Sequence, residues 1–195
     1  MNHRYACLLV TAAWISALAV PAHAIDVSLD PRATYLHVCN DAALNAPAFL
    51  LADLGISPGE TILIEVLGDF DNGPGGDTFV STCAVFSASD VLLAGAQLRR
   101  VQDAIAAGIP VTTANTFFCN EPTDIPEDFR IAGATPNTSV MVEVPAGSTH
   151  LFINACDHLF VDNLDPDGDY RVRITKVTLP VEAITWGRIK SMYQQ

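Results

Sequence analysis

The sequence predicts an all-β domain, a β-sandwich or jelly roll with one short helical insertion. Two observations lead to this class. Half of the 195 residues are hydrophobic and 16% are charged, which is typical of a chain that buries a core and not of a disordered one. Several short segments show strand-like alternation or are rich in β-branched residues, and turn-forming residues separate them, as in sandwiches and jelly rolls.

Six segments carry the strand pattern: 34–38, 61–67, 79–87, 139–144, 150–154 and 170–177. The last is the clearest, because Tyr170, Val172 and Ile174 alternate with Arg171 and Arg173, as a half-buried strand requires. Turn signals rich in Gly, Pro, Asn and Asp lie between the strands, at 57–59, 72–76, 136–137, 145–147 and 165–168.

The segment 89–108 breaks this pattern. Its apolar residues Leu92, Leu98, Val101 and Ile105 recur at nearly helical spacing, and Gly108 followed by Ile109 and Pro110 resembles a helix stop. We therefore expect one or two short helices here, within a long connection between strands.

The chain is expected to divide into three parts. Residues 1–24 have a basic start, an apolar run and a small-residue ending at Ala24, which is typical of a secretory signal peptide. A retained membrane anchor is the alternative, but the run is shorter than the roughly 20 apolar residues that span a bilayer. Residues 25–179 form the expected domain and 180–195 a tail. We predict a secreted protein, extracellular, on the cell surface or periplasmic, with no stable membrane span.

Removal of residues 1–24 leaves four cysteines: Cys39, Cys83, Cys119 and Cys156. In an oxidising compartment they are expected to form two disulfide bonds, for which three pairings exist. The favoured pairing joins Cys83 to Cys119, which would staple a long segment between two core strands, and Cys39 to Cys156. Zinc binding is the competing interpretation, and the lack of a C-x-x-C spacing argues against it.

The net charge of the chain indicates which classes of partner it can bind. The formal net charge is −12, which repels a nucleic-acid backbone and favours cations, neutral sugars or proteins. The densest acidic stretch, 157–169, holds five Asp and one Asn, and calcium is the natural ligand for such oxygen-rich loops. Asp165, Asp167 and Asp169 alternate, but no closing Glu follows, so this is not an EF-hand. A solvated turn-rich loop is the alternative.

A second acidic loop, 68–77, follows the strand 61–67. Its Gly and Asn residues suit tight turns, and its main-chain carbonyls would complete the coordination of an ion held by the first loop.

These segments together resemble the PA-IL-type calcium-dependent bacterial lectins. The similarity covers roughly residues 55–177 and rests on the run 144–153, Asp157, the pair Asp162-Asn163, the strand 170–174, and upstream matches at 58–64, 72–74, 125–126 and 129–130. The resemblance implies a galactose-binding-like β-sandwich with calcium at the sugar site.

Carried over by position, the resemblance implies side-chain calcium ligands from Asp157, Asp162 and Asn163, and main-chain ligands from Phe160 and Asn72. The ligand-binding surface is expected to include Asp157, His158, Asp162, Asn163 and Asp77. The loop 157–162 is shorter than in the lectins, and Asp162 stands where they have the first of two adjacent Asn residues. The resemblance therefore implies calcium more directly than galactose.

No G-x-S-x-G, H-E-x-x-H or glycine-rich phosphate motif is present, so the protein is expected not to be an enzyme. A glycoside hydrolase using Asp124, Glu127 and Asp128 is the weakest alternative. The expected function is calcium-dependent binding of a carbohydrate, galactose-like or a cell-surface glycan. The rival is an exported structural or adhesion module in which calcium only stabilises loops.

The tail 180–195 differs from the rest of the chain because it is basic and aromatic. Trp186, Ile189 and Tyr193 fall on one face of a helical turn, which fits a short peptide recognised by an export or surface partner. A frayed terminus is the alternative.

Overall fold

The computed structural model describes residues 24–38, 42–73, 76–108, 117–118, 121–122, 125–133, 138–157 and 159–177. Its elements are all strands: β1 (Ala24–Ser28), β2 (Ala33–Thr34), β3 (Leu44–Asn45), β4 (Ala48–Leu50), β5 (Thr61–Leu67), β6 (Phe70–Asp71), β7 (Asp77–Phe79), β8 (Thr82–Ser87), β9 (Ala104–Ile105), β10 (Phe117–Phe118), β11 (Glu121–Pro122), β12 (Phe129–Ala132), β13 (Ser139–Glu143), β14 (His150–Ala155) and β15 (Arg171–Lys176). The expectation of an all-β fold is confirmed. Within these residues no helix is long and apolar enough to cross a membrane.

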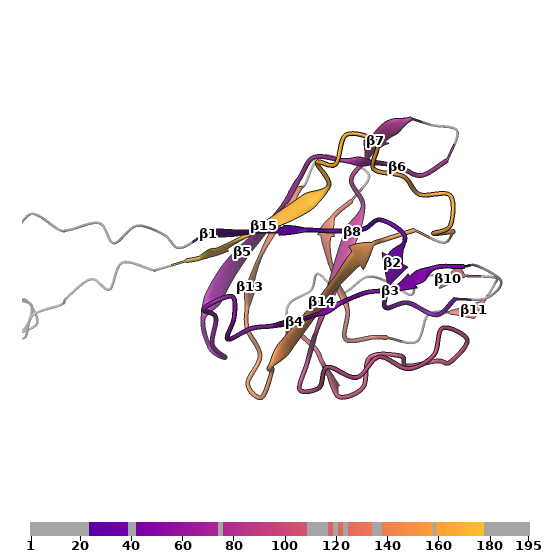
Figure 1. Ribbon diagram of the computed structural model, residues 1–195. Helices are drawn as coiled ribbons and strands as arrows, with labels where there is room; N and C mark the ends of the chain where they lie inside the picture. Colours follow the sequence, from indigo (N-terminus) through magenta and orange to yellow (C-terminus); the bar gives the residue numbers. More distant parts are fainter. Residues whose placement is uncertain are drawn as a thin grey trace, which may run out of the picture.

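Two larger antiparallel sheets organise the strands (Figure 1). One has the order β1-β15-β5-β13, and the other has the order β12-β8-β14-β4 with β9 added beside β8. Three two-stranded pairs complete the set: β2 with β3, β6 with β7, and β10 with β11. Most of the strands expected from alternation are present, but the segment 34–38 forms a strand only at Thr34.

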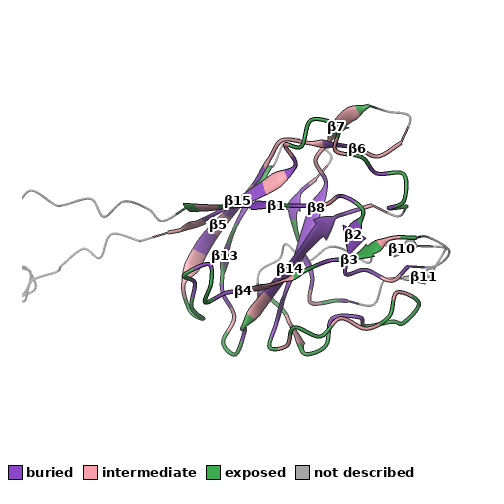
Figure 2. Ribbon diagram, viewed as in Figure 1, coloured by how far each residue is buried: buried purple, intermediate pink, exposed green. Residues whose placement is uncertain are grey.

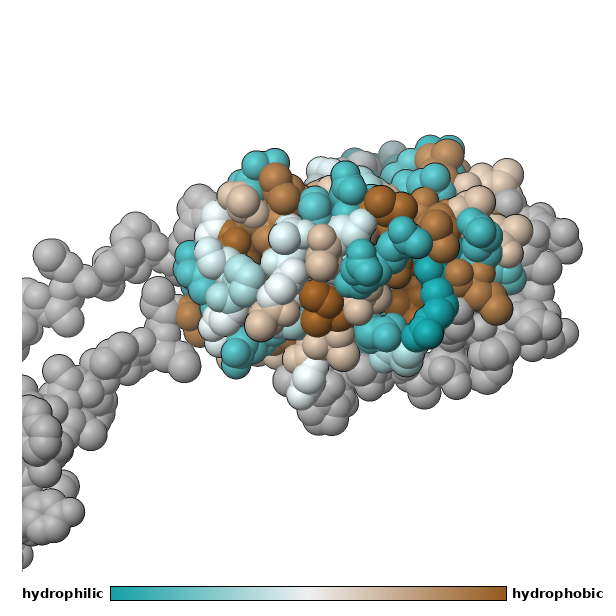
Figure 3. Space-filling view, turned by 90° about the horizontal axis from the view of Figure 1, so that it is seen from below, coloured by the Kyte–Doolittle hydropathy of each residue, from teal (hydrophilic) through white to brown (hydrophobic). Residues whose placement is uncertain are grey.

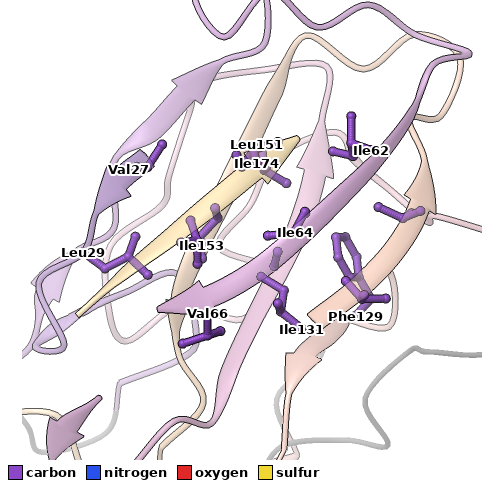
Figure 4. Close-up of a cluster of buried hydrophobic side chains, with 14 of the residues drawn as sticks. Val27, Leu29, Ile62, Ile64, Val66, Phe129, Ile131, Leu151, Ile153 and Ile174 are labelled. Carbon is purple, nitrogen blue, oxygen red and sulfur yellow. The ribbon is translucent and has the colours of Figure 1, made fainter. Parts of the chain in front are cut away.

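Both sheets contribute to one hydrophobic core. Val27, Ile62, Ile64 and Ile174 come from the first sheet, and Leu151, Ile153, Phe129 and Ile131 from the second (Figure 4). In β15, Val172 and Ile174 are buried between less buried Arg171 and Arg173, as the alternation predicted. Each fully buried side chain of this size contributes about 1.5–3 kcal/mol, so the shared core fixes how the strands pair.

Strands β8 and β14 are buried on both faces (Figure 2). Ala84 and Phe86 belong to the main core, whereas Cys83 and Val85 belong to a second cluster on the other face of the same strand. Tyr35, Leu36, Val101, Ile125 and Phe160 cover that second face. Long connections between strands therefore cover the outer face of the second sheet.

One disulfide bond joins Cys83 to Cys156, whose Cα atoms are 5.4 Å apart. The predicted pairings of Cys83 with Cys119 and of Cys39 with Cys156 are therefore wrong. The physical reason is strand pairing: Cys83 on β8 lies opposite Asn154 on β14, and Cys156 follows two residues later. The bond indicates a non-reducing environment. Cys39 and Cys119 lie outside the described residues, as do residues 1–23, His158 and the tail 180–195.

The predicted helical insertion is also wrong. Residues 89–108 contain no helix; Leu92 and Val101 instead form an isolated β-bridge, and Ala104–Ile105 is the short strand β9. Burial explains the misleading spacing. Leu92 and Val101 pack in the second cluster, Ile105 lies against the main core and Leu98 is exposed, so the four residues do not form one helix face.

Candidate functional site

Two acidic loops meet at one end of the molecule, beside β6 and β7 (Figure 1). Asp71 and Leu164 exchange two main-chain hydrogen bonds of 2.8 Å, and the main-chain N–H of Asp69 donates to Oδ1 of Asp169 at 3.0 Å. The loops 68–77 and 157–169 are therefore tied together directly. Their meeting, on which the expected ligand surface depended, is confirmed.

Gly68 makes this close approach feasible. Its φ is +72°, and a Cβ atom placed there would lie 2.0 Å from Oδ1 and 2.3 Å from the main-chain oxygen of Asp169. No other residue fits without displacing the neighbouring backbone. The glycine expected only to turn the chain thus also admits a carboxylate of the other loop.

The carboxylates of Asp165, Asp167 and Asp169 form the centre of the site. One oxygen from each lies within 4.8 Å of the others, a spacing that suits a shared cation. Oδ1 of Asp165 accepts the main-chain N–H groups of Gly168 and Asp169, each at 3.1 Å, so the loop is held in place by its own side chains. The alternating Asp spacing in the sequence was the signal for this cluster.

Asp69 and Asp77 from the other loop lie near enough for their charges to interact with this cluster, and the five together are called the five-carboxylate group. Partial burial, followed by the charges of neighbouring aspartates, raises the pKa of Asp69 and of Asp77. Because neighbouring negative charges disfavour the ionised form of each group, the site carries more negative charge than it readily holds. Oδ1 of Asp77 is enclosed and has no hydrogen-bond partner.

The calcium ligands implied by the lectin resemblance lie apart from this group. Asn163 is fully buried, with Nδ2 donating to the main-chain oxygen of Pro31 at 2.9 Å, and Phe160 is buried in the second hydrophobic cluster. Asp162 is exposed and approaches Gly73, next to Asn72. Asp157 is half-buried. None of the implied calcium ligands belongs to the five-carboxylate group; Asp77, expected in the ligand-binding surface, does.

A pocket of about 400 Å³ adjoins the carboxylate group through Asp165. Asp30 and Arg32 line it, joined by two side-chain hydrogen bonds of 3.1 and 3.0 Å, and the exposed Leu164 adds an apolar wall. Asn163 also lines it, and the buried Oδ1 of Asn163 has no hydrogen-bond partner. The pocket therefore combines hydrogen-bond donors, hydrogen-bond acceptors and apolar surface.

Sequence reasoning missed several of these residues. Nothing in the chain order indicates that Asp30 and Arg32 lie beside Asn163, because the contact joins segments about 130 residues apart. The buried Arg100 was missed too, since arginine is almost never fully buried without a partner. Asp69 stood within the recognised acidic loop, and only the fold shows that it faces Asp169.

Fold and site define a class: an all-β, disulfide-bonded domain with two interlocked acidic loops. Comparisons of the chain with protein family models, with curated proteins and with solved structures found no match. The functional argument accordingly rests on the residues themselves.

Proposed function

We propose that this chain is a secreted, non-catalytic β-sandwich domain of the jelly-roll or galactose-binding-like kind that binds carbohydrate in a calcium-dependent manner. The observation that carries the proposal is the cluster of Asp165, Asp167 and Asp169, against which the loop with Asp69 and Asp77 is held by the hydrogen bond from Asp69 to Asp169. The proposed ion site differs from the one that the lectin resemblance implies.

Calcium fits this group on chemical grounds. It takes six to eight oxygen ligands in flexible geometry, and both loops offer carboxylates together with main-chain carbonyls. Burial and, after it, mutual repulsion raise the pKa of Asp69 and Asp77, and a divalent cation would offset the repulsion. It would also supply the missing partner for the enclosed Oδ1 of Asp77.

Carbohydrate fits the adjoining pocket. Sugars present hydroxyl groups that donate to carboxylates and accept from guanidinium groups, and both types lie side by side in Asp30 and Arg32. A hydroxyl would also satisfy Oδ1 of Asn163, whose orientation is fixed because Nδ2 must face the carbonyl oxygen of Pro31. The volume is within the range of small-molecule sites.

A structural or adhesion module is the second candidate, favoured by one observation. Oδ1 of Asp165 accepts two main-chain N–H groups and Oδ1 of Asp169 accepts a third, so the loops are already built around their carboxylates. If the protein is such a module, calcium stabilises the loops and no sugar binds.

The deciding experiment passes the protein over immobilised galactose-type and other sugars, with calcium and with chelator. The proposal predicts retention that chelator abolishes and that Asp30→Asn weakens at least tenfold, while Asp53→Asn, an exposed aspartate in the turn after β4, leaves it unchanged. Retention by no sugar, with calcium still raising the melting temperature, would favour the structural module. Hydrolysis of a chromogenic glycoside, lost in Glu127→Gln, would contradict the non-catalytic assignment.

A further inference from the structure

A second pocket lies between the segment that joins β8 to β9 and the residues Ile125 and Glu127, at the end of the molecule opposite the acidic loops. This segment runs along the lower edge of Figure 1, whereas β6 and β7 are at the top. The pocket has a volume of about 420 Å³, and its lining includes the polar side chains of Arg99, Gln102, Asp103 and Glu127. Val101 and Ile125, both 4% exposed, contribute apolar surface.

The backbone around this pocket is held in an unfavourable conformation. Arg99 and Asp103 have φ values of 51° and 54°, and they are the two non-glycine residues with positive φ in the described part of the chain. A left-handed conformation costs about 1–2 kcal/mol for a residue such as Arg, and less for Asp. Both strained residues line the pocket, and strain of this kind concentrates at binding sites.

Arg100, between the two strained residues, anchors the segment. It is 1% exposed, and its guanidinium donates to the main-chain oxygens of Leu93, Thr34 and Leu36 and to Oδ1 of Asn45. Further on, Oγ of Ser87 donates to the main-chain oxygen of Gln102 at 2.6 Å, and the N–H of Ala88 to that of Asp103 at 3.1 Å. The rim of the pocket is thus rigid before any ligand binds, which lowers the entropic cost of binding.

The polar groups of the rim favour a neutral, hydroxyl-rich ligand. Two carboxylates, Asp103 and Glu127, stand beside one guanidinium, Arg99, and one amide, Gln102. An anion would meet two like charges on an acidic protein, and a purely apolar ligand would leave the polar groups without partners. Hydroxyl groups satisfy both kinds of group, while the carbon face of a sugar ring would lie against Leu93, a half-buried apolar residue of the lining.

An ion pair already joins two of the residues that line the pocket. Arg99 and Glu127 approach to 3.6 Å, with side chains 67% and 25% exposed. An exposed pair at this distance contributes little stability, so a ligand hydroxyl is able to insert between the charges at small cost. Figure 3 shows the molecule of Figure 1 from below, and hydrophilic and hydrophobic side chains are intermixed on this end.

We propose that this second pocket binds a saccharide unit without calcium. The proposal does not rest on the ion site, because none of its residues belongs to the acidic loops. A chain with both sites would bind glycans at two opposite ends and bridge them.

The test uses the full mature chain in chelator. ¹⁵N-labelled protein is titrated with galactose, glucose, mannose, fucose and N-acetylglucosamine to millimolar concentrations and followed by NMR. The expected result is saturable shifts of the Gln102 and Ala104 amides with at least one sugar. Binding should weaken at least tenfold in Glu127→Gln and in Asp103→Asn, in which Asn retains the left-handed backbone that it readily adopts.

Two controls separate this site from the first. Asp53→Asn and Asp167→Asn should bind sugar in chelator as the unsubstituted protein does, because neither residue lies at the pocket. Shifts that appear only with calcium, or that Asp167→Asn removes, would assign the sugar to the acidic loops and overturn this proposal alone. Absence of shifts with every sugar in chelator, or shifts indifferent to both pocket variants, would overturn it as well.

Discussion

At the scale of single residues, Gly68 decides whether the two acidic loops fit together. Gly68→Ala should destabilise the protein by about 3 kcal/mol or more, since it adds strain at positive φ to a clash with Asp169. Gly59→Ala is the matched control. Gly59 has φ +84° with nothing within 4 Å, so it should lose only about 1–2 kcal/mol in urea unfolding. Equal losses in both variants would show that the loops do not interlock as described.

The carboxylate group predicts an unusual dependence of stability on pH. A raised pKa means that the folded protein holds protons on Asp69 and Asp77 more tightly than the unfolded chain does. This stabilisation is complete below about pH 4, the ordinary Asp range, and is lost as the pH rises through the raised values. Without calcium, Asp77→Asn should therefore be more stable than the unsubstituted protein at pH 7, and the difference should vanish on acidification.

Other carboxylates make the protein less stable as the pH falls. The effect of Asp77 is therefore seen only in the difference between Asp77→Asn and the unsubstituted protein. Hydrogen bonds from Arg173, Arg32 and Lys176 lower the pKa values of Asp26, Asp30 and Glu60 respectively, so their contributions are lost as the pH falls. Both proteins share these groups. A stability difference that stays constant from pH 7 to pH 4 in chemical denaturation would show that Asp77 is not held in a repulsive group.

At the scale of elements, the sequence predicted strands where local alternation and burial agree. β5 and β15 match closely because alternate residues face one core and solvent. The prediction from the sequence failed where a segment packs against two cores, as between β8 and β9, because its apolar residues do not recur with a single period. The cysteine pairing failed for a related reason: which strands are neighbours is a tertiary fact, and Cys83 meets Cys156 through the pairing of β8 with β14.

Arg100 fixes the position of one segment, and the sequence alone did not reveal this role. It holds the segment between β8 and β9 against Thr34, Leu36 and Asn45, by hydrogen bonds to two main-chain oxygens and one side-chain amide oxygen. Arg100→Met should cost about 3 kcal/mol or more, because it leaves buried carbonyl groups without donors. The neighbouring Arg99→Met should change stability by less than about 0.5 kcal/mol, since that side chain is 67% exposed. Urea unfolding of both variants checks the contrast, and similar losses would contradict it.

At the scale of the whole molecule, the chain brings residues about 100 positions apart into one charged group. Asp69 and Asp169 meet because β5 and β15 are antiparallel neighbours, so the loop that follows β5 lies beside the loop that precedes β15. The sequence predicted both acidic loops and their meeting. It could not predict which carboxylates converge, because that choice depends on the register of the strands and on the close approach at Gly68.

The central claim is that this group holds calcium, and calorimetric titration of calcium into the chelated protein tests it most directly. Binding should occur in the parent and in Asp53→Asn, and should weaken at least tenfold in Asp167→Asn, whose exposed carboxylate supports little of the fold. Asp162→Asn should bind as the parent does if the ion lies among the five carboxylates. No calcium binding by the parent, or binding lost in Asp162→Asn and intact in Asp167→Asn, would contradict the proposed site.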